Sequence, residues 1–322
     1  MPNYQGVWSL STQFQNAGAW PNPPLPVDSN IGVFQLGYSS GYINTIEYID
    51  ISTTANAEDF GDLNISATYA AGSSSSTRAL FSGFQDTGGV IDNISYLSIT
   101  SKGNAADFGD LTVARRTAAA ASNETRSIVN GGWTGSAYSE ILDYVTIAST
   151  GNATNFGNHS VAGGIGFTAS CASTTRGVWA GGRDTFTYYN LIEYVTIATT
   201  GNASDFGDLT AVNAYGAGCS SSTRGVFGFV WNGSTNLNTI EYITIASTGN
   251  ATDFGDLINS TAAESFGAVS NKTRGVFAGS GNKNMCYVTI ASTGNATDFA
   301  DLLTDTNIGF PAGASANHGG IS

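Results

Sequence analysis

Pairs of aspartate residues recur at a fixed spacing along the chain, and clustered carboxylates are ligands that calcium prefers. The pairs flank a Phe-Gly dipeptide in most copies and comprise Asp59/Asp62, Asp107/Asp110, Asp205/Asp208, Asp253/Asp256 and Asp298/Asp301. One copy carries Asn155 and Asn158 instead, which shape a turn but bring no charge. Because Asx residues beside glycine are primarily turn formers, we interpret the pairs as structural and expect no bound metal.

Five arginines also recur at one repeat position, each directly before an apolar stretch: Arg78, Arg126, Arg176, Arg224 and Arg274. A guanidinium can join neighbouring elements by donating to carboxylates or carbonyls. The alternative is a ring of cations around a bound anion. A single ligand site would not need the residue in every repeat, so we favour the structural interpretation.

Catalytic chemistry has little support in the residues present. The two histidines, His159 and His318, occupy unrelated repeat positions, and we find no nucleophile elbow, His-based metal cluster or phosphate-binding loop. Carboxylate pairs of the glycosidase kind stay open, although the turns already explain these acids. Cys171 and Cys219 share one repeat position, where free cysteine suits a small buried site. We therefore predict a non-enzymatic protein without a cofactor.

Charge and hydropathy exclude several classes of partner. The net charge is −13, from 24 acidic and 11 basic residues, whereas nucleic acid binding needs a basic footprint. Anionic membrane surfaces are disfavoured for the same reason. The sequence has no apolar run of transmembrane length and no Sec-type signal at its N-terminus. We therefore expect no nucleic acid partner and no membrane insertion.

The elements that position all these residues are repeats. A sequence motif that is clearest from Ala246 to Leu257 occurs six times. Its aromatic residue recurs at steps of 48, 48, 50, 48 and 45 residues. Its positions are Phe60, Phe108, Phe156, Phe206, Phe254 and Phe299. Such a period indicates a repeat architecture whose units stack to bury a shared core.

Each unit contains four short apolar stretches separated by turn residues, which is typical of one propeller blade. We predict an all-β fold: a six-bladed β-propeller of four-stranded blades over residues 31–322. The approximate blades are 31–77, 78–125, 126–175, 176–223, 224–273 and 274–318. The first unit lacks a small-residue strand of its own, so we expect the segment from Ile308 to Ser315 to pair with it and close the ring.

Residues 1–30 stand apart as an N-terminal arm. They hold five of the six prolines of the chain, and proline favours an extended connector over a strand in a sheet interior. The stretch from Gly6 to Leu10 resembles a short strand. We expect this arm to dock on a partner through Trp8, Phe14 and Trp20, or to pack under the main domain.

The connection between the first and second strand of each blade differs between repeats, and loops on a rigid scaffold often carry binding residues. Aromatic side chains gather there, and they suit sugar or protein surfaces. The alternative is that several of them only cover the outer edge of a blade. The candidate binding residues are Tyr38, Tyr42, Phe84, Trp133, Tyr138, Phe186, Tyr188, Tyr189 and Trp231.

The chain resembles known families at two levels. The glycine doublets Gly131-Gly132 and Gly181-Gly182, with Tyr194 and Tyr242 on the following strands, are similar to kelch-type propeller repeats, although Phe206 and Phe254 stand where kelch repeats have tryptophan. The repeated Thr-Arg-Gly-Val-Phe-Ala-Gly and Asp-Phe-Gly-Asp-Leu motifs resemble repeats in virion proteins of marine tailed bacteriophages, including cyanophages. This second resemblance covers nearly the whole chain.

The resemblance implies a virion protein that is assembled in the host cytoplasm. Our first hypothesis is a tail or tail-fibre component that presents its loops to a host-surface glycan or protein. The second is a capsid decoration or head-fibre protein that contacts mainly other virion proteins, with the arm as its attachment. A lectin-like cellular propeller is the third. We also expect the protein to form a homo-oligomer.

Overall fold

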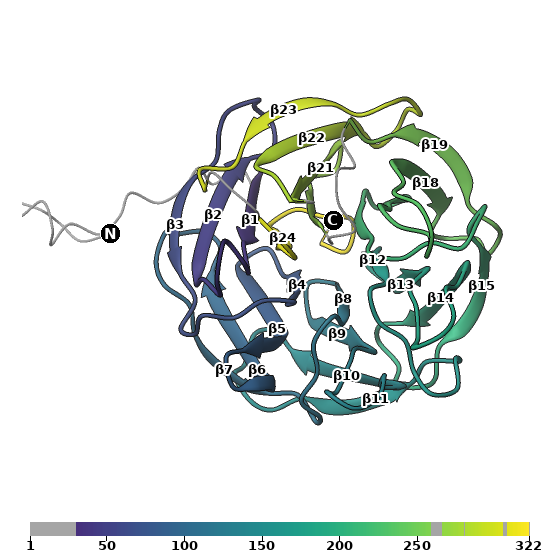
Figure 1. Cartoon of the computed structure of the whole chain (residues 1–322), viewed down its shortest axis with the longest axis horizontal. Helices are drawn as coiled ribbons and strands as arrows, with labels where there is room; N and C mark the ends of the chain where they lie inside the picture. Colours follow the sequence, from purple (N-terminus) through teal and green to yellow (C-terminus); the bar gives the residue numbers. More distant parts are fainter. Residues whose placement is uncertain (1–29, 259–265, 280, 305–307, 322) are drawn as a thin grey trace, which may run out of the picture.

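The computed structural model describes residues 30–258, 266–279, 281–304 and 308–321. These residues form six sheets of four antiparallel strands around a central axis, and they contain no helix. The chain is therefore an all-β, six-bladed β-propeller with four-stranded blades (Figure 1). The arm at residues 1–29, with Trp8, Phe14 and Trp20, lies outside the described residues.

Within each sheet the strands follow one another from the axis outward. The innermost strands are β24 (Ala312–Ser315), β4 (Ala71–Ser74), β8 (Ala119–Ser122), β12 (Ala169–Ala172), β16 (Ala217–Ser220) and β20 (Phe266–Ser270). The second strands are β1 (Ile31–Gln35), β5 (Arg78–Asp86), β9 (Arg126–Asn130), β13 (Arg176–Ala180), β17 (Arg224–Gly228) and β21 (Arg274–Gly279).

The third strands are β2 (Thr45–Asp50), β6 (Gly89–Ser98), β10 (Ile141–Thr146), β14 (Leu191–Thr196), β18 (Thr239–Thr244) and β22 (Asn284–Thr289). The outermost strands are β3 (Glu58–Asp62), β7 (Ala106–Asp110), β11 (Thr154–Asn158), β15 (Ser204–Asp208), β19 (Thr252–Asp256) and β23 (Thr297–Asp301). Each sheet takes its innermost strand from the end of the preceding sequence repeat, so sheets and repeats are offset by one strand.

The ring closes as the small-residue segment near the C-terminus predicts. β24 pairs antiparallel with β1, with Gly32 opposite Ser315 and Gln35 opposite Ala312. The first sheet therefore contains strands from both ends of the propeller. This pairing satisfies the edge of β1 that would otherwise stay open.

Small residues on the inner strands allow the blades to converge on the axis. Cys171 and Cys219 are buried there, as their shared repeat position predicts. The Cys171 sulfur lies against Gly225 of the next blade, where a Cβ atom would clash with it. Burial raises the pKa of Cys219 to about 12, so this thiol is an unreactive packing group at neutral pH.

The repeated Asp-Phe-Gly-Asp segment is the outermost strand of each blade, as in β15, so its prediction as a turn is wrong; it joins each blade to the next at the outer edge. The phenylalanine fills the space between sheets, and Phe206 is 2% exposed. Gly207 has a φ of +147°, and a Cβ atom on it would lie 2.5 Å from the carbonyl oxygen of Gly249 in the following blade. The Asn250 side chain then accepts a hydrogen bond from the Asp208 amide at 3.1 Å. The same hydrogen bond recurs at the other blade boundaries, so the outermost strand links neighbouring blades all around the ring.

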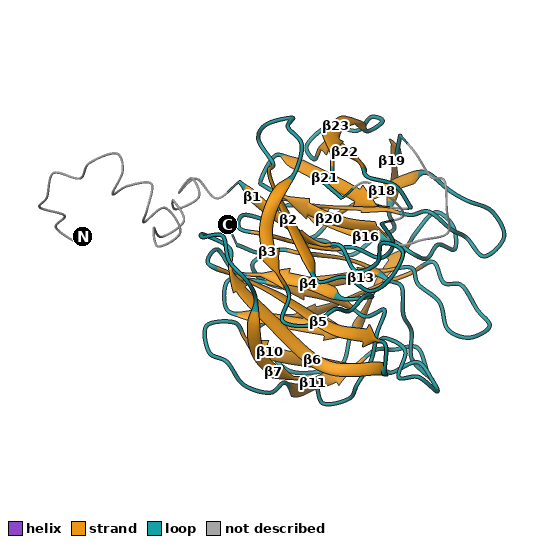
Figure 2. Cartoon of the chain, turned by 60° about the vertical axis from the view of Figure 1, so that its left-hand side comes forward, coloured by secondary structure: helices purple, strands orange, loops and turns teal. Residues whose placement is uncertain are grey.

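The propeller has two faces. We call the face that carries the connections between second and third strands the loop face; the chain also reaches each new innermost strand from this side, because neighbouring strands are antiparallel. The opposite face is the tail face, where β1 begins and where residues 316–321 end the described chain. Figure 2 shows the long connections on one side and the C-terminal end on the other.

Candidate functional site

The repeated arginines are structural, as their recurrence predicts. Arg176 lies over the ring of Tyr194 in its own blade, 4.6 Å from the ring centroid. Its Nη1 donates a hydrogen bond of 2.9 Å to the carbonyl oxygen of Ile245 in the next blade. Equivalent bonds from the other four arginines end on Ile147, Ile197, Ile290 and Ile51. The five guanidinium groups therefore join blades and do not surround one ligand.

Blade one has Ile31 at the arginine position, and a lysine from the next blade takes over part of the role. Lys102 lies 4.4 Å from the ring centroid of Tyr48. Its Nζ is 3.1 Å from Glu58, whose carboxylate also accepts a hydrogen bond of 2.6 Å from the Tyr48 hydroxyl. The cation over the tyrosine is thus retained although the arginine is not.

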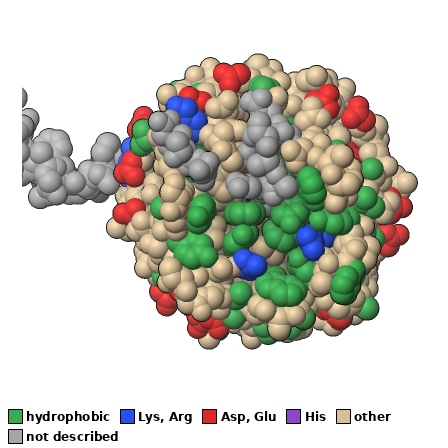
Figure 3. Space-filling model, viewed as in Figure 1, with side chains coloured by type: hydrophobic (Ala, Val, Ile, Leu, Met, Phe, Trp, Pro, Cys, Tyr) green, Lys and Arg blue, Asp and Glu red, His purple; other side chains and the backbone are tan. Residues whose placement is uncertain are grey.

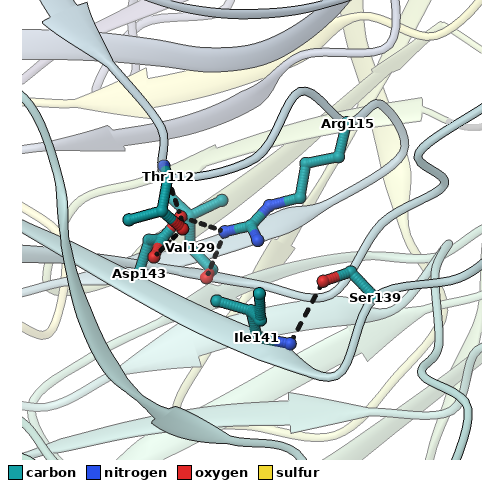
Figure 4. A network of polar contacts seen from close by, with 6 residues as sticks. All are labelled: Thr112, Arg115, Val129, Ser139, Ile141 and Asp143. Atoms are coloured by element: carbon teal, nitrogen blue, oxygen red, sulfur yellow. Dashed lines mark hydrogen bonds and ion pairs between the residues drawn. The ribbon is translucent and has the colours of Figure 1, made fainter.

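A set of buried carboxylates, missed in the sequence, joins the third strand of one blade to the preceding blade. Asp143 accepts hydrogen bonds from the amide and hydroxyl of Thr112 and lies 3.0 Å from Arg115, and both charged side chains are fully buried (Figure 4). Glu47, Glu193 and Glu241 occupy the same repeat position and also accept bonds from the preceding connection. The signal was an acidic residue inside an otherwise apolar strand.

His159 forms a buried pair with one of these carboxylates, Glu193. Its Nε2 lies 2.9 Å from Glu193, and both side chains are almost completely buried. The pair occupies an interface between blades and does not line a pocket described here. We therefore treat it as part of the scaffold.

Most of the predicted binding aromatics lie on the loop face. Trp133 and Tyr138 pack edge to face, with ring centroids 5.0 Å apart. The Tyr188 hydroxyl accepts hydrogen bonds of 3.2 Å from both Trp231 Nε1 and Arg183 Nη1. Figure 3 looks onto this face and shows hydrophobic side chains gathered near its centre, with basic side chains among them.

Blade one contributes Tyr38 and Tyr42 to the same face. Their rings pack edge to face with centroids 6.0 Å apart, and Tyr38 is 39% exposed. The Tyr42 hydroxyl accepts a hydrogen bond of 2.9 Å from Gln85, a residue of the next blade. The two tyrosines therefore extend the aromatic surface across a blade boundary.

Three of the predicted residues differ from the rest. Phe84 is fully buried in the core between blades and cannot contact a ligand, so its inclusion as a binding residue is wrong; β5 continues through this position and turns the side chain inward. The Tyr189 hydroxyl donates to Asp184 at 2.8 Å and stabilises its own loop. Phe186, at the tip of that loop, is 92% exposed and stands away from the central group.

A ring of residues in the left-handed backbone region surrounds the mouth of the central channel on the loop face, which we call the channel mouth. Each precedes an innermost strand: Tyr69 (φ +65°), Thr117 (+57°), Phe167 (+59°), Tyr215 (+57°) and Phe310 (+58°). Each conformation costs roughly 1–2 kcal/mol in a residue with a Cβ atom. The sequence reasoning missed these residues, although an aromatic residue before the small-residue strand in four repeats was a visible signal.

Backbone hydrogen bonds explain why the left-handed conformation recurs. The amide of Thr117 donates to the Tyr69 carbonyl at 3.1 Å, Phe167 donates to Thr117 at 2.9 Å, and Tyr215 donates to Phe167 at 3.1 Å. The turned backbone thereby links successive blades around the channel. Glycine would satisfy the same geometry without strain, so the bulky side chains are not required by the backbone.

The rings at the channel mouth form two tilted pairs. Tyr69 and Phe310 have centroids 4.1 Å apart, and Phe167 and Tyr215 have centroids 4.2 Å apart. Thr117 lies between the two pairs in chain order around the axis. All of them except Tyr215 line a pocket of about 60 Å³ together with their chain neighbours.

Two arginines that do not belong to the repeated set lie beside the channel mouth. The Arg116 guanidinium is 4.7 Å from the Tyr69 ring centroid and donates to Gln85. Arg183 donates to Tyr188 and, at 3.5 Å, to Tyr215. Burial raises the pKa of Tyr138 although both arginines oppose the shift, so this phenol stays protonated as a hydrogen-bond donor at neutral pH. The arrangement offers flat rings, hydroxyls and two cations on one surface.

Below the mouth, a cavity of about 120 Å³ runs between the innermost strands, and His318 lines it. His318 Nδ1 accepts a hydrogen bond from the Gly320 amide at 3.0 Å, so Nε2 carries the proton and faces the Ser74 carbonyl at 3.3 Å. The Gly319 amide donates to Ser220 of another blade at 3.0 Å. Residues 316–321 thus lie across the channel on the tail face.

Among the described residues no group of three or more His, Cys, Asp or Glu side chains is placed to hold a metal ion. In the same part of the chain we find no helix long and apolar enough to span a membrane. Neither a protein-family model nor a curated protein sequence matches this chain. The geometry of the loop face therefore carries the functional argument.

Proposed function

We propose that this protein is a non-enzymatic virion protein of a tailed bacteriophage, of the kelch-like kind, and that its propeller presents the loop face to a glycan or protein on the host surface. The main support is the difference between the two faces. The aromatic residues and unrepeated arginines lie on the loop face, whereas residues 1–29 join the propeller at Asn30 on the tail face. Asn30 is held there by its carbonyl, which accepts from Ile51 at 2.8 Å.

This polarity suits a display protein, because one face attaches and the other remains free to bind. Tryptophan and tyrosine combine flat apolar area with a polar group, which favours both sugar and protein recognition. Rigid blades hold these side chains in place, so little conformational entropy is lost on binding. The repeat motifs that resemble marine phage virion proteins supply the biological setting.

A density map of the assembled particle tests the proposal. We expect the chain on the tail or a fibre with the tail face toward the particle and the loop face toward solvent. Trp133→Ala and Trp231→Ala particles should adsorb more slowly to host cells, with unchanged particle assembly. A map with the loop face packed against the shell, or adsorption unchanged in both variants, would contradict host binding through this surface.

A capsid decoration or head-fibre protein is the second candidate. Phe186 favours it, because a phenylalanine that is 92% exposed at a loop tip resembles an anchor for a protein partner. In that case the map would show Phe186 inserted into a neighbouring virion protein. Phe186→Ser would then release the chain from the particle and leave adsorption governed by other components.

A further inference from the structure

The channel mouth has a notch at one position of its ring. The two stacked pairs, Tyr69 with Phe310 and Phe167 with Tyr215, flank Thr117, the smallest side chain of the five described positions. Arg116 precedes Thr117 in the chain and lies over the Tyr69 ring. A cation therefore stands directly beside the gap between two aromatic walls.

Polar atoms in the notch lack partners. Thr117 is 5% exposed and lines the pocket, yet its hydroxyl has no hydrogen-bond partner among the described residues. The Nε of Arg116 is likewise buried without a partner there. Buried polar groups are normally satisfied, so these atoms point to a ligand that supplies an acceptor and hydroxyl groups.

The charge of the notch is unusual for this chain. The net charge is −13, yet within the described residues neither Arg116 nor Arg183 forms an ion pair. The carboxylate nearest in sequence, Asp184, accepts instead from the amides of Phe186 and Thr187 at 2.7 Å. Arg183 donates to the Asp184 and Thr185 carbonyls and to two tyrosine hydroxyls, so its bonds fix its position but do not neutralise its charge. Both guanidinium charges can therefore attract an incoming anion, and arginine forks match carboxylates well.

The backbone around the mouth disfavours a peptide as that anion. Peptides that add to a propeller or sheet need unpaired strand edges. Here the amides of Thr117, Phe167 and Tyr215 already donate to one another's carbonyls around the ring. A sugar ring needs no such edge, because its C–H face can lie on an aromatic ring and its hydroxyls can meet side chains.

We infer that the channel mouth binds a saccharide that bears a carboxylate. Its sugar ring lies against the aromatic pairs, a hydroxyl bonds to Thr117, and its carboxylate is held by the charges of Arg116 beside Tyr69 and Arg183 beside Tyr215. This inference rests on the proposed function and narrows it to one site and one class of glycan. A bound ligand would also explain why bulky residues occupy left-handed positions at which the backbone does not require them.

An array tests the inference with oligosaccharides that contain uronic or sialic acid, each printed beside its carboxyl-reduced form. We expect the acidic members to bind, and their reduced forms to bind at least about ten-fold more weakly, as the loss of a charge-assisted hydrogen bond implies. Arg116→Gln and Arg183→Gln should each weaken binding to the acidic members by about ten-fold or more. Lys272→Gln, which removes one exposed charge on the tail face, is the matched control and should bind like the wild type.

Phe167→Gly separates a binding role from a folding role. Glycine accepts the left-handed backbone, so the variant should stay folded by circular dichroism while binding falls about ten-fold or more. Equal binding of acidic and reduced members, or wild-type binding by both arginine variants, would overturn the inference and leave the proposed function standing. Arginine-dependent binding of a peptide C-terminus, without any acidic glycan, would also overturn it. Loss of adsorption in the particle experiment, by contrast, bears on the proposed function alone.

Discussion

The outer edge of the propeller and the channel mouth solve the same problem, which is to join one blade to the next, with opposite choices of residue. At the outer edge the position with positive φ is glycine in most repeats, as at Gly207, and Ala300 (φ +153°) in the last one, and its neighbours are nearly identical in every repeat. At the channel mouth the strained positions carry tyrosine, phenylalanine or threonine. At most outer-edge positions the residue type therefore suits the backbone conformation, whereas the residue types at the channel mouth disfavour it.

In a repeat protein, positions that depart from the repeat are the first place to look for function. Recurrence marks the contacts that most blade boundaries share, including the arginine to carbonyl bonds and the buried carboxylates. Departure from recurrence marks positions that only one surface needs, such as Arg116 and Arg183. The comparison can be tested by substitutions that should cost much stability at the first kind of position and little at the second.

The largest effect should come from breaking a buried ion pair of the scaffold. Asp143→Ala leaves Arg115 charged and fully buried without its carboxylate, and such a loss typically costs about 3–5 kcal/mol. We expect a decrease of that size in the free energy of unfolding, measured by denaturant titration. Asp205→Ala, at an exposed position of β15, should change it by less than about 0.5 kcal/mol.

The double variant Asp143→Leu/Arg115→Met sharpens this prediction. Replacing both charges with apolar side chains removes the unpaired cation, so the double variant should be more stable than Asp143→Ala. An Asp143→Ala protein as stable as the wild type would show that the pair is not part of the scaffold.

An intermediate effect is expected from pH at the tail face. Burial lowers the pKa of His318 from an ordinary value of about 6.5 to about 4. The neutral ring is therefore favoured in the folded protein, and its contribution is complete above pH 6.5 and lost progressively as the pH falls from 6.5 to 4. Between pH 7 and pH 4.5 the wild type should lose roughly 2–3 kcal/mol more unfolding free energy than His318→Gln.

Denaturant titrations of both proteins at the two pH values measure this difference, since titrations elsewhere in the chain cancel between them. Protonation of Nδ1 would also remove the acceptor of the Gly320 amide, so the protection factors of the Gly319 and Gly320 amides against exchange should fall. Parallel pH profiles for the two proteins would contradict the assignment of a neutral, buried His318.

The smallest effect on stability should come from the channel mouth. Phe167→Gly loses a half-buried ring but relieves a left-handed φ of +59°, and these two contributions oppose each other with similar size. We expect the unfolding free energy to change by less than about 1 kcal/mol. Phe206→Ala, which removes a buried ring from the outermost strand β15 of the same blade, should cost about 3–5 kcal/mol. Similar losses at both positions would erase the distinction between scaffold and mouth.

Much of the scaffold could be predicted from the sequence, because each blade repeats the same physical solution. The spacing of the repeated phenylalanine predicted six blades. The small-residue segment near the C-terminus, which the first repeat lacks, predicted the pairing of β24 with β1. The arginine contacts between blades followed from their recurrence. These inferences needed only periodicity and the requirement that sheet edges be satisfied.

The candidate site was predictable only in part. Variable loops directed attention to Trp133, Tyr188 and Trp231, but the length of β5, which buries Phe84, was not visible in the pattern. The left-handed ring escaped detection because its backbone conformation arises from contacts between blades. Arg116 and Arg183 were hidden for a related reason: only the packing of neighbouring blades brings both of them close to Tyr138.

The closure of the ring by β24 also has a mechanical consequence. Residues 1–29 join the propeller at Asn30, directly before β1, and β1 is bonded along its length to β24 on one side and β2 on the other. A pull transmitted through residues 1–29 would load these two ladders in shear, with all their hydrogen bonds sharing the force. Blade one is therefore arranged to resist tension applied at Asn30, because the hydrogen bonds of both ladders would have to break together.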